Sequence, residues 1–170
     1  MGSLDEALTL DPLGANRWRA HADPDHESIN AMFGGWTAAV SLAAVLASAS
    51  SPLAPSALTV NFIRAIAPGT RPVLHVEHLG GSRSIDHWRA DLRNEEDGVL
   101  DASATVVLTA RRSTEEHDQW VMPEAPAPAT LEPFHAPGSQ GQQTDLRLIA
   151  GSPDSYGGGD TRTSAWIRMV

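Results

Sequence analysis

A long apolar segment preceded by two glycines dominates the hydrophobic pattern of this chain of 170 residues. Apolar residues run almost unbroken over 36–49, and the polar residues Thr37, Ser41 and Ser48 fall on one narrow stripe at helical spacing. A helix that is apolar on most sides is buried on most sides. We therefore expect one buried helix over about 35–50, ended by the Ser-Ser-Pro sequence that follows.

Short stretches of alternating apolar and polar residues surround this segment and predict an antiparallel sheet. Glycine-containing turn signals separate the later stretches, and short turns make neighbouring strands antiparallel. Small residues such as Ala102 and Ala104 share the apolar face of the last stretch, where a helix can lie close. The expected strands are 16–22, 56–64, 73–79, 85–93 and 99–110.

The pattern changes after residue 112, because prolines recur from Pro123 to Pro137 and interrupt regular structure. Two further strands are expected at 144–150 and 164–169, joined by a loop over 151–163. Two strands alone bury little surface. The expected organisation is therefore a domain over 1–112, a proline-rich linker over 113–143, and a segment 144–170 that either opens a second, truncated domain or adds strands to a sheet.

The composition excludes several classes of chemistry. The formal net charge of −9 argues against nucleic acid, because phosphate contacts need clustered cations. The chain has no cysteine and no lysine, which excludes disulfides, thiolate nucleophiles and Schiff-base lysines. Asp5 and Glu6 stand where a signal peptide would be basic, and the apolar run is shorter than the roughly 20 residues that span a bilayer. We therefore expect a cytoplasmic protein without membrane contact.

Several segments resemble the acyl-CoA thioesterase II-like family of double-hotdog thioesterases. They are Phe33-Gly34-Gly35, 58–64 with Pro68-Gly69, 76–79 leading into 81–84, and 98–108. In the tail, 145–147 and 165–168 resemble the beginning of the family's second hotdog. The resemblance covers about 16–112 and the start of that second hotdog. It implies an α+β hotdog fold, in which an antiparallel β-sheet wraps around one long buried α-helix, and an acyl-CoA substrate without a cofactor.

The resemblance also implies a partner. In such enzymes the best-supported catalytic groups are an Asp, a Ser or Thr, and a Gln, and they lie in the second hotdog. The sequence ends before those positions, so none of them is assigned here. Because the active site forms between the helices of two hotdogs, the resemblance implies a homodimer or a double-hotdog assembly.

Thioester hydrolysis needs a stabiliser for the oxyanion and a group that activates water. The backbone N–H groups of Gly34 and Gly35 at the helix start are candidates for the first role. Alternatively, these glycines only permit tight packing of helix and sheet. His26 and Asn30 precede the helix and are candidates to activate or orient water. Alternatively, His26 is an exposed loop residue and Asn30 a local cap.

Three further residues are candidates for substrate binding. Asn61 lies opposite the apolar face of its strand and meets either a pocket or solvent. Ser82 and Arg83 occupy a hairpin, where the arginine either meets a CoA phosphate or is solvated. The histidines at 75, 78 and 87 do not predict a metal site, because residues three apart in a strand point to opposite faces.

Three functions are compatible with the sequence. The first is an acyl-CoA thioester hydrolase of lipid metabolism that needs a second hotdog to complete its site. The second is a non-catalytic hotdog that binds acyl groups or scaffolds a partner, favoured by the absence of Asp and Glu from the predicted helix. The third is a hotdog enoyl-CoA hydratase or dehydratase, for which Asp25-His26 is the nearest acidic–histidine pair.

Overall fold

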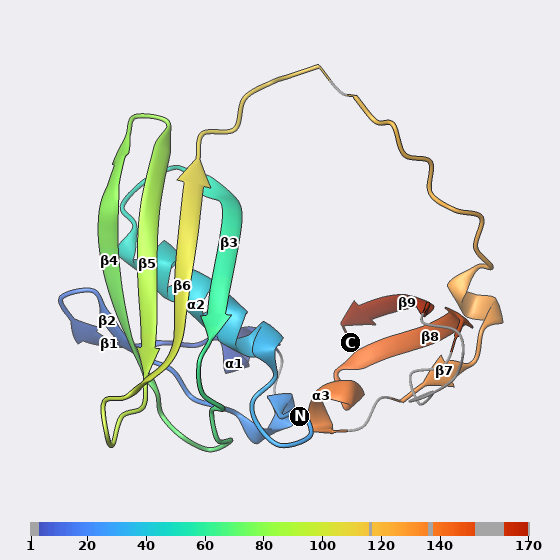
Figure 1. The fold of residues 1–170 in the computed structure, drawn as a ribbon, viewed down its shortest axis with the longest axis horizontal. Helices are drawn as coiled ribbons and strands as arrows, with labels where there is room; N and C mark the ends of the chain where they lie inside the picture. Colours follow the sequence, from blue (N-terminus) through green and yellow to red (C-terminus); the bar gives the residue numbers. More distant parts are fainter. Residues whose placement is uncertain (1–3, 116, 136–137, 152–161, 170) are drawn as a thin grey trace. The chain divides into compact units, whose positions relative to one another are not determined.

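The computed structural model describes residues 4–115, 117–135, 138–151 and 162–169. The chain divides into two compact units, Met1–Ser113 and Thr114–Val170. The elements of the first unit, shown in Figure 1, are α1 (Leu4–Ala7), β1 (Asp11–Gly14), β2 (Arg17–Arg19), a 3₁₀ turn (Pro24–His26), α2 (Gly34–Ser48), β3 (Ala54–Phe62), β4 (Val73–Ser82), β5 (Ile85–Arg93) and β6 (Leu100–Thr109).

The six strands form one antiparallel sheet in the order β1-β2-β4-β5-β6-β3. The meander β4-β5-β6 confirms the predicted hairpins. β3 does not pair with β4, its successor in the chain, but with β6, and Thr59 lies opposite Thr105. β3 therefore ends the sheet, and none of the other strands in the described residues pairs with its outer edge.

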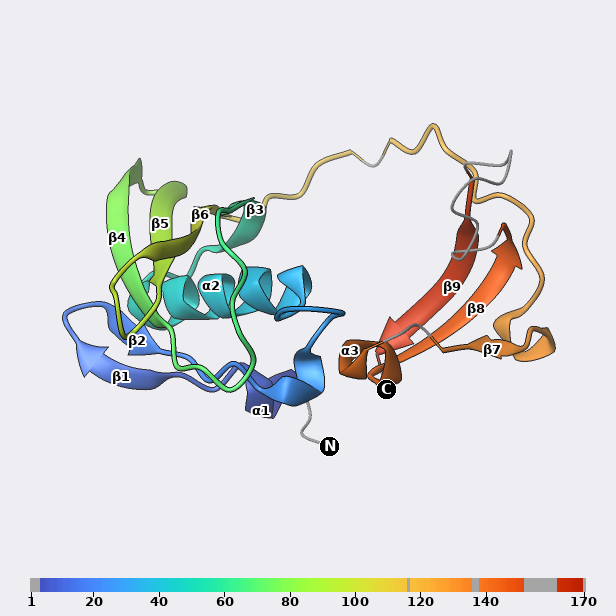
Figure 2. The same ribbon diagram turned by 60° about the horizontal axis from the view of Figure 1, so that its bottom comes forward.

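The predicted buried helix is confirmed as α2, which lies across the inner face of the sheet (Figure 2). Val40, Ala44 and Val45 are fully buried in the core. Ala90 on β5 and Ala104 on β6 belong to the same core and lie opposite each other in register. Because both side chains are small, the helix can approach the sheet closely. The hotdog arrangement follows from this pairing of a small-residue sheet face with an apolar helix.

The beginning of the chain differs from the sequence prediction. A single strand over 16–22 is expected, whereas the structure has two short strands, β1 and β2, joined by a turn. Ala15 and Asn16 in that turn have positive φ angles of 47° and 58°. Asn tolerates this conformation but Ala adopts it rarely, so no simple turn signal marks the hairpin. The short strand β1 lies at the sheet edge, where its Pro12 is tolerated.

The second unit contains a three-stranded antiparallel sheet, β7-β8-β9. The bounds of β8 and β9 are those predicted. Three short elements lie inside the stretch 113–143, where none was expected. The predicted loop 151–163 lies, apart from its ends, outside the described residues. The elements of this unit are a 3₁₀ turn (Pro128–Thr130), β7 (Pro133–Phe134), α3 (Ser139–Gln142), β8 (Thr144–Ala150) and β9 (Ser164–Met169).

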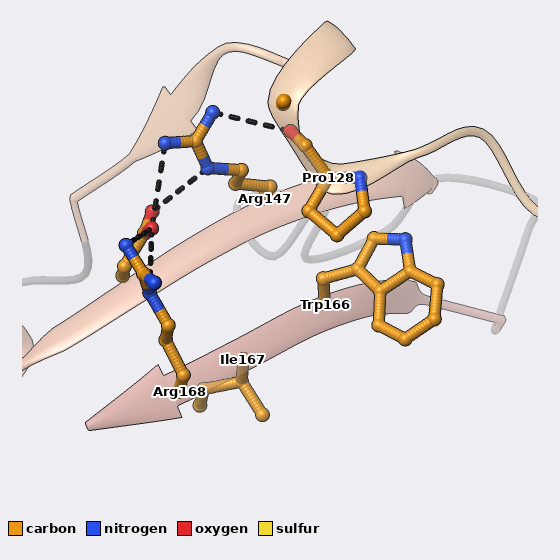
Figure 3. A pocket seen from close by; sticks show the side chains of 7 residues that line it. Pro128, Arg147, Trp166, Ile167 and Arg168 are labelled. Atoms are coloured by element: carbon orange, nitrogen blue, oxygen red, sulfur yellow. Dashed lines mark hydrogen bonds and ion pairs between the residues drawn. The ribbon is translucent and has the colours of Figure 1, made fainter.

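The second half of the proline-rich stretch is attached to this sheet, as Figure 3 shows in part. The Arg147 guanidinium on β8 donates to the carbonyl oxygens of Pro128 and Leu131, at 3.1 and 2.8 Å. The Trp166 indole N–H on β9 donates to the carbonyl oxygen of Pro126 at 2.9 Å. Two side chains from neighbouring strands therefore hold the backbone of residues 126–131.

Among the helices of the described residues, none is both long enough and apolar enough to cross a membrane.

Candidate functional site

The loop before α2 is held by backbone hydrogen bonds that leave the helix start uncapped. Glu27 and Met32 form an isolated antiparallel bridge, and the Phe33 N–H donates to the carbonyl oxygen of His26 at 3.0 Å. Phe33 occupies the N-cap position, and its side chain makes no capping hydrogen bond. In the described part of the chain, the N–H groups of Gly34 and Gly35 meet no acceptor. These two donors are therefore available to a ligand.

Two aromatic rings cover the two glycines. A Cβ atom at Gly34 would lie 3.3 Å from ring carbons of Phe62, and one at Gly35 would overlap the ring of Phe33. Both rings are partly exposed, Phe33 at 40% and Phe62 at 61%. A methyl group at Gly35 would require the Phe33 ring to move, and one at Gly34 would require a smaller shift of the Phe62 ring, so close packing favours glycine at both positions. Their proposed role as oxyanion donors is compatible with that packing and stays a prediction.

A hollow of about 350 Å³ lies between the helix start and the end of β3. The helix side is lined by Met32, Gly34 and Thr37, and the sheet side by residues 62–66 and 101–102. Thr37 is only 2% exposed, and its hydroxyl has no hydrogen-bond partner within the described residues. Gly34 and Thr37 are three residues apart and share one side of the helix. A backbone donor and a side-chain hydroxyl therefore border the same space.

An arginine bound to two carboxylates fixes the sheet side of this hollow. The Arg64 Nε donates to Asp101 Oδ1 at 2.6 Å, and its two terminal nitrogens donate to Asp97 at 3.0 and 3.2 Å. The N–H groups of Ile63 and Arg64 both donate to the Asp101 carbonyl oxygen. The hydrogen bond from Arg64 is the main reason that the pKa of Asp97 is lowered, and both carboxylates raise the pKa of Arg64. The positive charge of Arg64 is therefore neutralised by these two carboxylates, which together outweigh it by one negative charge.

His26 is buried at 3% exposure, so its interpretation as an exposed loop residue is wrong. Its Nε2 atom is buried without a hydrogen-bond partner in the described part of the chain. His26 does not line the hollow at the helix start, although its carbonyl oxygen holds Phe33 beside it. Asn30 is exposed in the loop between the bridge residues, and the N-cap of α2 is Phe33. Asn30 therefore does not cap this helix.

The three predicted substrate-binding residues lie away from the helix start. Asn61 is exposed and alternates with Phe62, whose ring faces α2, so Asn61 lies on the outer face of the sheet. Ser82 ends β4 and Arg83 is exposed in the β4–β5 hairpin. The strand register places this hairpin beside the beginning of β3, whereas Gly34 contacts the end of β3. Within the first unit, these three residues therefore do not lie near Gly34 and Gly35.

Among the described residues, no group of three or more His, Cys, Asp or Glu side chains could hold a metal ion. His78 is 3.3 Å from Asp86 through its Nε2 atom, and its ring centroid lies 4.7 Å from that of Trp88. His75 lies on the sheet with a pKa lowered mainly by burial and further by Arg17. His78 therefore has local partners on the sheet, whereas the surroundings of His75 favour its neutral form.

A second hollow, of about 440 Å³, lies in the other unit beside Trp166 and Pro128 (Figure 3). Asp145 there accepts hydrogen bonds from Arg147 at 2.9 Å and from Arg168 at 3.2 Å. Both arginines lower the pKa of Asp145, with Arg147 the larger cause. Because Arg147 also binds two backbone carbonyls, its donors are used within the chain. This cluster serves to hold the proline-rich segment.

Comparison with known proteins identifies the family of the first unit. The model of the acyl-CoA thioesterase N-terminal domain family matches residues 22–110. The chain belongs to this family. The matched residues include α2, its two glycines and the strands that surround it. No curated protein matches the chain.

Several solved structures share the fold of this chain. A hotdog protein of unknown function from Alicyclobacillus acidocaldarius is 29% identical with a TM-score of 0.87, and the match covers 99% of this chain and 63% of that one. Acyl-CoA thioesterase II TesB2 from Mycobacterium marinum is 23% identical with a TM-score of 0.74, covering 98% and 60%. A tesB protein from Mycobacterium avium is 20% identical with a TM-score of 0.70, covering 88% and 54%. The chain thus spans about 63% or less of each of these proteins.

Three features of this unit do not follow from the sequence pattern. The sequence places Thr37 on a polar stripe of the helix, but the spacing of that stripe does not show that Thr37 borders a hollow. Arg64 was recognised only as the end of a strand, although its position two residues after Phe62 could have suggested a role at the strand end. The contact of Phe62 with Gly34 joins two elements that are far apart in the sequence, so no local signal predicts it.

Proposed function

We propose that this chain is the hotdog domain of an acyl-CoA thioester hydrolase and acts together with a second hotdog. The observation that carries the proposal is the hollow at the start of α2, where Gly34, whose N–H has no acceptor in the described residues, lines the same space as Thr37. Backbone donors placed in advance at a developing oxyanion contribute about 3–4 kcal/mol each to the lowering of the barrier. Membership of the acyl-CoA thioesterase N-terminal domain family supports the same chemistry.

In the proposed reaction, the thioester carbonyl oxygen lies against the N–H groups of Gly34 and Gly35. Water attacks the carbonyl carbon, and the C=O electron pair moves onto the oxygen that these donors stabilise. When the carbonyl forms again, the C–S bond breaks, CoA leaves as a thiolate, and the carboxylic acid is released. The proton lost by the water goes to a base and then to the thiolate.

Within this chain, His26 is the proposed base. A neutral imidazole near pH 7 can accept the proton of an attacking water. The buried Nε2 atom of His26 has no partner in the described part of the chain, which supports the choice. Because His26 does not line the hollow, the proposal requires the loop before α2 to bring this atom within reach of the water. Asn30 is exposed, so in this proposal it orients water only when a second hotdog covers the loop.

The apolar side chains around the helix start favour an acyl group as the bound part of the substrate. Phe33, Phe62 and Ile63 are all partly exposed beside the donors of α2. Burying a hydrocarbon chain against them gains about 25 cal/mol for each Å² removed from water. Ser82, Arg83 and Asn61 lie elsewhere on the unit, and we propose that they contact the CoA portion of a substrate bound to a neighbouring hotdog.

The proposed partner is a second hotdog, in a homodimer or a double-hotdog assembly. The outer edge of β3 has no partner strand among the described residues, and Leu58 and Phe62 on this strand are exposed. An edge strand with free backbone groups readily pairs with another strand. A role in the lipid metabolism of the cytoplasm belongs to the same proposal.

The test is to incubate the purified protein with acyl-CoAs from two to sixteen carbons long, follow the free thiol, and determine its size in solution. We expect thiol release by the species of dimeric size, and a rate that depends on acyl length. Heat-denatured protein is the control for spontaneous hydrolysis. A folded dimer that releases no thiol would contradict the proposal.

One observation favours a second candidate, a hotdog that binds acyl groups without catalysis. The helix α2 carries no Asp or Glu, and therefore no acidic group that could activate water. Calorimetric titration with the same acyl-CoAs separates the two candidates, because a pure binder would bind without thiol release. Addition of water to an enoyl-CoA, followed by the loss of its absorbance, tests the hydratase alternative in the same samples.

A further inference from the structure

Two buried residues with hydroxyl groups, Thr37 and Ser41, lie one turn apart on α2, and only the Ser41 hydroxyl forms a hydrogen bond within the described residues. The Ser41 hydroxyl donates to the carbonyl oxygen of Thr37 at 2.8 Å, inside the helix. The Thr37 hydroxyl makes no hydrogen bond within the described residues, although the residue is only 2% exposed. The hydroxyl is not among the fully buried side-chain atoms without a partner in the described residues, so it keeps access to the hollow that Thr37 lines. The position of Thr37 in the hollow points to a ligand as the missing partner.

The surroundings of the Thr37 hydroxyl limit what that ligand group is. The hollow it borders also contains Gly34, whose N–H has no acceptor in the described part of the chain. The guanidinium of Arg64 is occupied by Asp97 and Asp101, and so does not compete as a cation. A group that accepts from both a backbone N–H and a hydroxyl is an oxygen with two lone pairs, such as a carbonyl oxygen.

We propose that the Thr37 hydroxyl is a further donor to the carbonyl oxygen of an acyl thioester, in addition to the N–H groups of Gly34 and Gly35. This proposal rests on the proposed function and adds a catalytic residue to it. During attack by water, the carbonyl oxygen gains the electron pair and the hydrogen bonds from these donors become stronger. The hydroxyl keeps its proton throughout. When the C–S bond breaks, the electron pair returns to the carbonyl and the hydroxyl bond relaxes.

The test compares substitutions of Thr37 that keep or remove the hydroxyl. Thr37→Val keeps the branched shape and removes the donor, so we expect kcat to fall by about 10²-fold with little change in KM. Thr37→Ser keeps the donor and should remain within a few-fold of the wild-type rate. Ser41→Ala is the matched control, because that hydroxyl is buried on the same helix but satisfied by the backbone. Ser41→Ala should retain the wild-type kcat.

A second readout separates an oxyanion donor from a structural residue. A trifluoromethyl ketone analogue of the acyl-CoA forms a tetrahedral adduct with water, whereas an acyl thioether analogue has no carbonyl oxygen. Thr37→Val should weaken binding of the ketone by about the same factor as kcat, and leave the thioether affinity unchanged. A residue that only supports the fold would affect both analogues together with the melting temperature. If Thr37→Val does not fold, Thr37→Ala serves for the same comparison.

The outcomes distinguish this inference from the proposed function. If the wild type hydrolyses the thioester and Thr37→Val has the same kcat and ketone affinity, the role of Thr37 is overturned. The proposed function is not affected by that result. A Thr37→Ser variant as slow as Thr37→Val would also overturn the role of Thr37. A wild type that binds the ketone but hydrolyses nothing would refute the proposed function. In that case, a selective loss of ketone affinity in Thr37→Val would still support the carbonyl contact.

Discussion

Trp18 on β2 donates its indole N–H to the hydroxyl of Ser48, in the last turn of α2, at a distance of 2.8 Å. The Ser48 hydroxyl donates in turn to the carbonyl oxygen of Ala44, also at 2.8 Å. This chain of two bonds fixes the end of the helix to the sheet, while the contact of Gly34 with Phe62 fixes its beginning. The central helix is thus located at both ends by specific contacts.

Replacing Ser48 with alanine should destabilise the first unit. The substitution leaves the partly buried indole N–H of Trp18 without its acceptor, which costs about 1–3 kcal/mol of unfolding free energy. Urea unfolding followed by circular dichroism measures the loss. Ser50→Ala, at an exposed position just beyond the helix, is the control and should change stability by less than about 0.5 kcal/mol. Equal effects of the two substitutions would show that the bond contributes nothing.

The ring of Phe33 should determine the effect of a methyl group at Gly35. In the wild type, Gly35→Ala forces the ring of Phe33 to move and should lower stability or leave it unchanged. In a Phe33→Ala background, the same change should raise stability by up to about 1 kcal/mol, because Ala favours the helix over Gly. A double-mutant cycle in urea measures the coupling. Strict additivity would contradict the contact between these residues.

Small residues on β6 should be required for the close approach of α2. Ala104 is buried beneath the helix, so Ala104→Leu should cost about 1–3 kcal/mol through overpacking. Thr105→Val, at the exposed neighbouring position, is the control and should be nearly neutral. Thermal unfolding of both variants provides the comparison. A stable, dimer-competent Ala104→Leu protein would mean that the helix can move away from the sheet.

The first unit should lose stability at acidic pH, partly because Asp97 becomes protonated. Its hydrogen bond from Arg64 lowers the pKa of this carboxyl below the ordinary value of 3.8. A carboxyl with a lowered folded pKa contributes stability above its unfolded pKa and loses that contribution as the pH falls through the folded pKa. The melting temperature of Asp97→Asn should therefore decrease less than that of the wild type between about pH 4 and pH 2.

The control for this measurement is Glu96→Gln. Glu96 is the exposed neighbour of Asp97 and forms no ion pair in the described part of the chain. Its melting curve should follow that of the wild type over the same pH range. If Asp97→Asn follows the wild type as well, the ion pair with Arg64 does not contribute to acid stability.

The clamp on the proline-rich segment should protect that segment from proteolysis. Arg147→Gln removes the hydrogen bonds to the carbonyl oxygens of Pro128 and Leu131. Elastase cleavage within 126–131 should accelerate by about tenfold, corresponding to roughly 1.4 kcal/mol of easier local opening. Arg168→Gln is the matched control, because this exposed arginine binds Asp145 and not the segment. Equal cleavage of both variants would exclude a specific role for Arg147.

Local sequence signals predicted much of the fold. The bounds of β5, β8 and β9 follow from alternating polarity between turn signals, and α2 follows from its long apolar run. The order of strands was beyond such signals, because β3 finds β6 through contacts between residues far apart in the chain. The hairpin of β1 and β2 does not follow from the sequence, because Ala15 adopts a positive φ angle that alanine rarely adopts.

The sequence predicts only the backbone features of the candidate site. Paired glycines before an apolar run indicate a close approach at a helix start, and the rings of Phe33 and Phe62 explain that requirement. The burial of His26 and the unsatisfied hydroxyl of Thr37 depend on which elements surround them. A sequence pattern identifies such residues as polar, but only the tertiary structure shows where they lie.

The pairing of β3 with β6 has a consequence for the order in which the molecule forms during synthesis. Thr59 pairs with Thr105, which the ribosome adds 46 residues later. α2 and β3 therefore emerge before the strand on which β3 docks exists, and the nascent chain must keep both in solution in the meantime. The meander β4-β5-β6, whose contacts are local, should assemble first, with β3 closing onto it last.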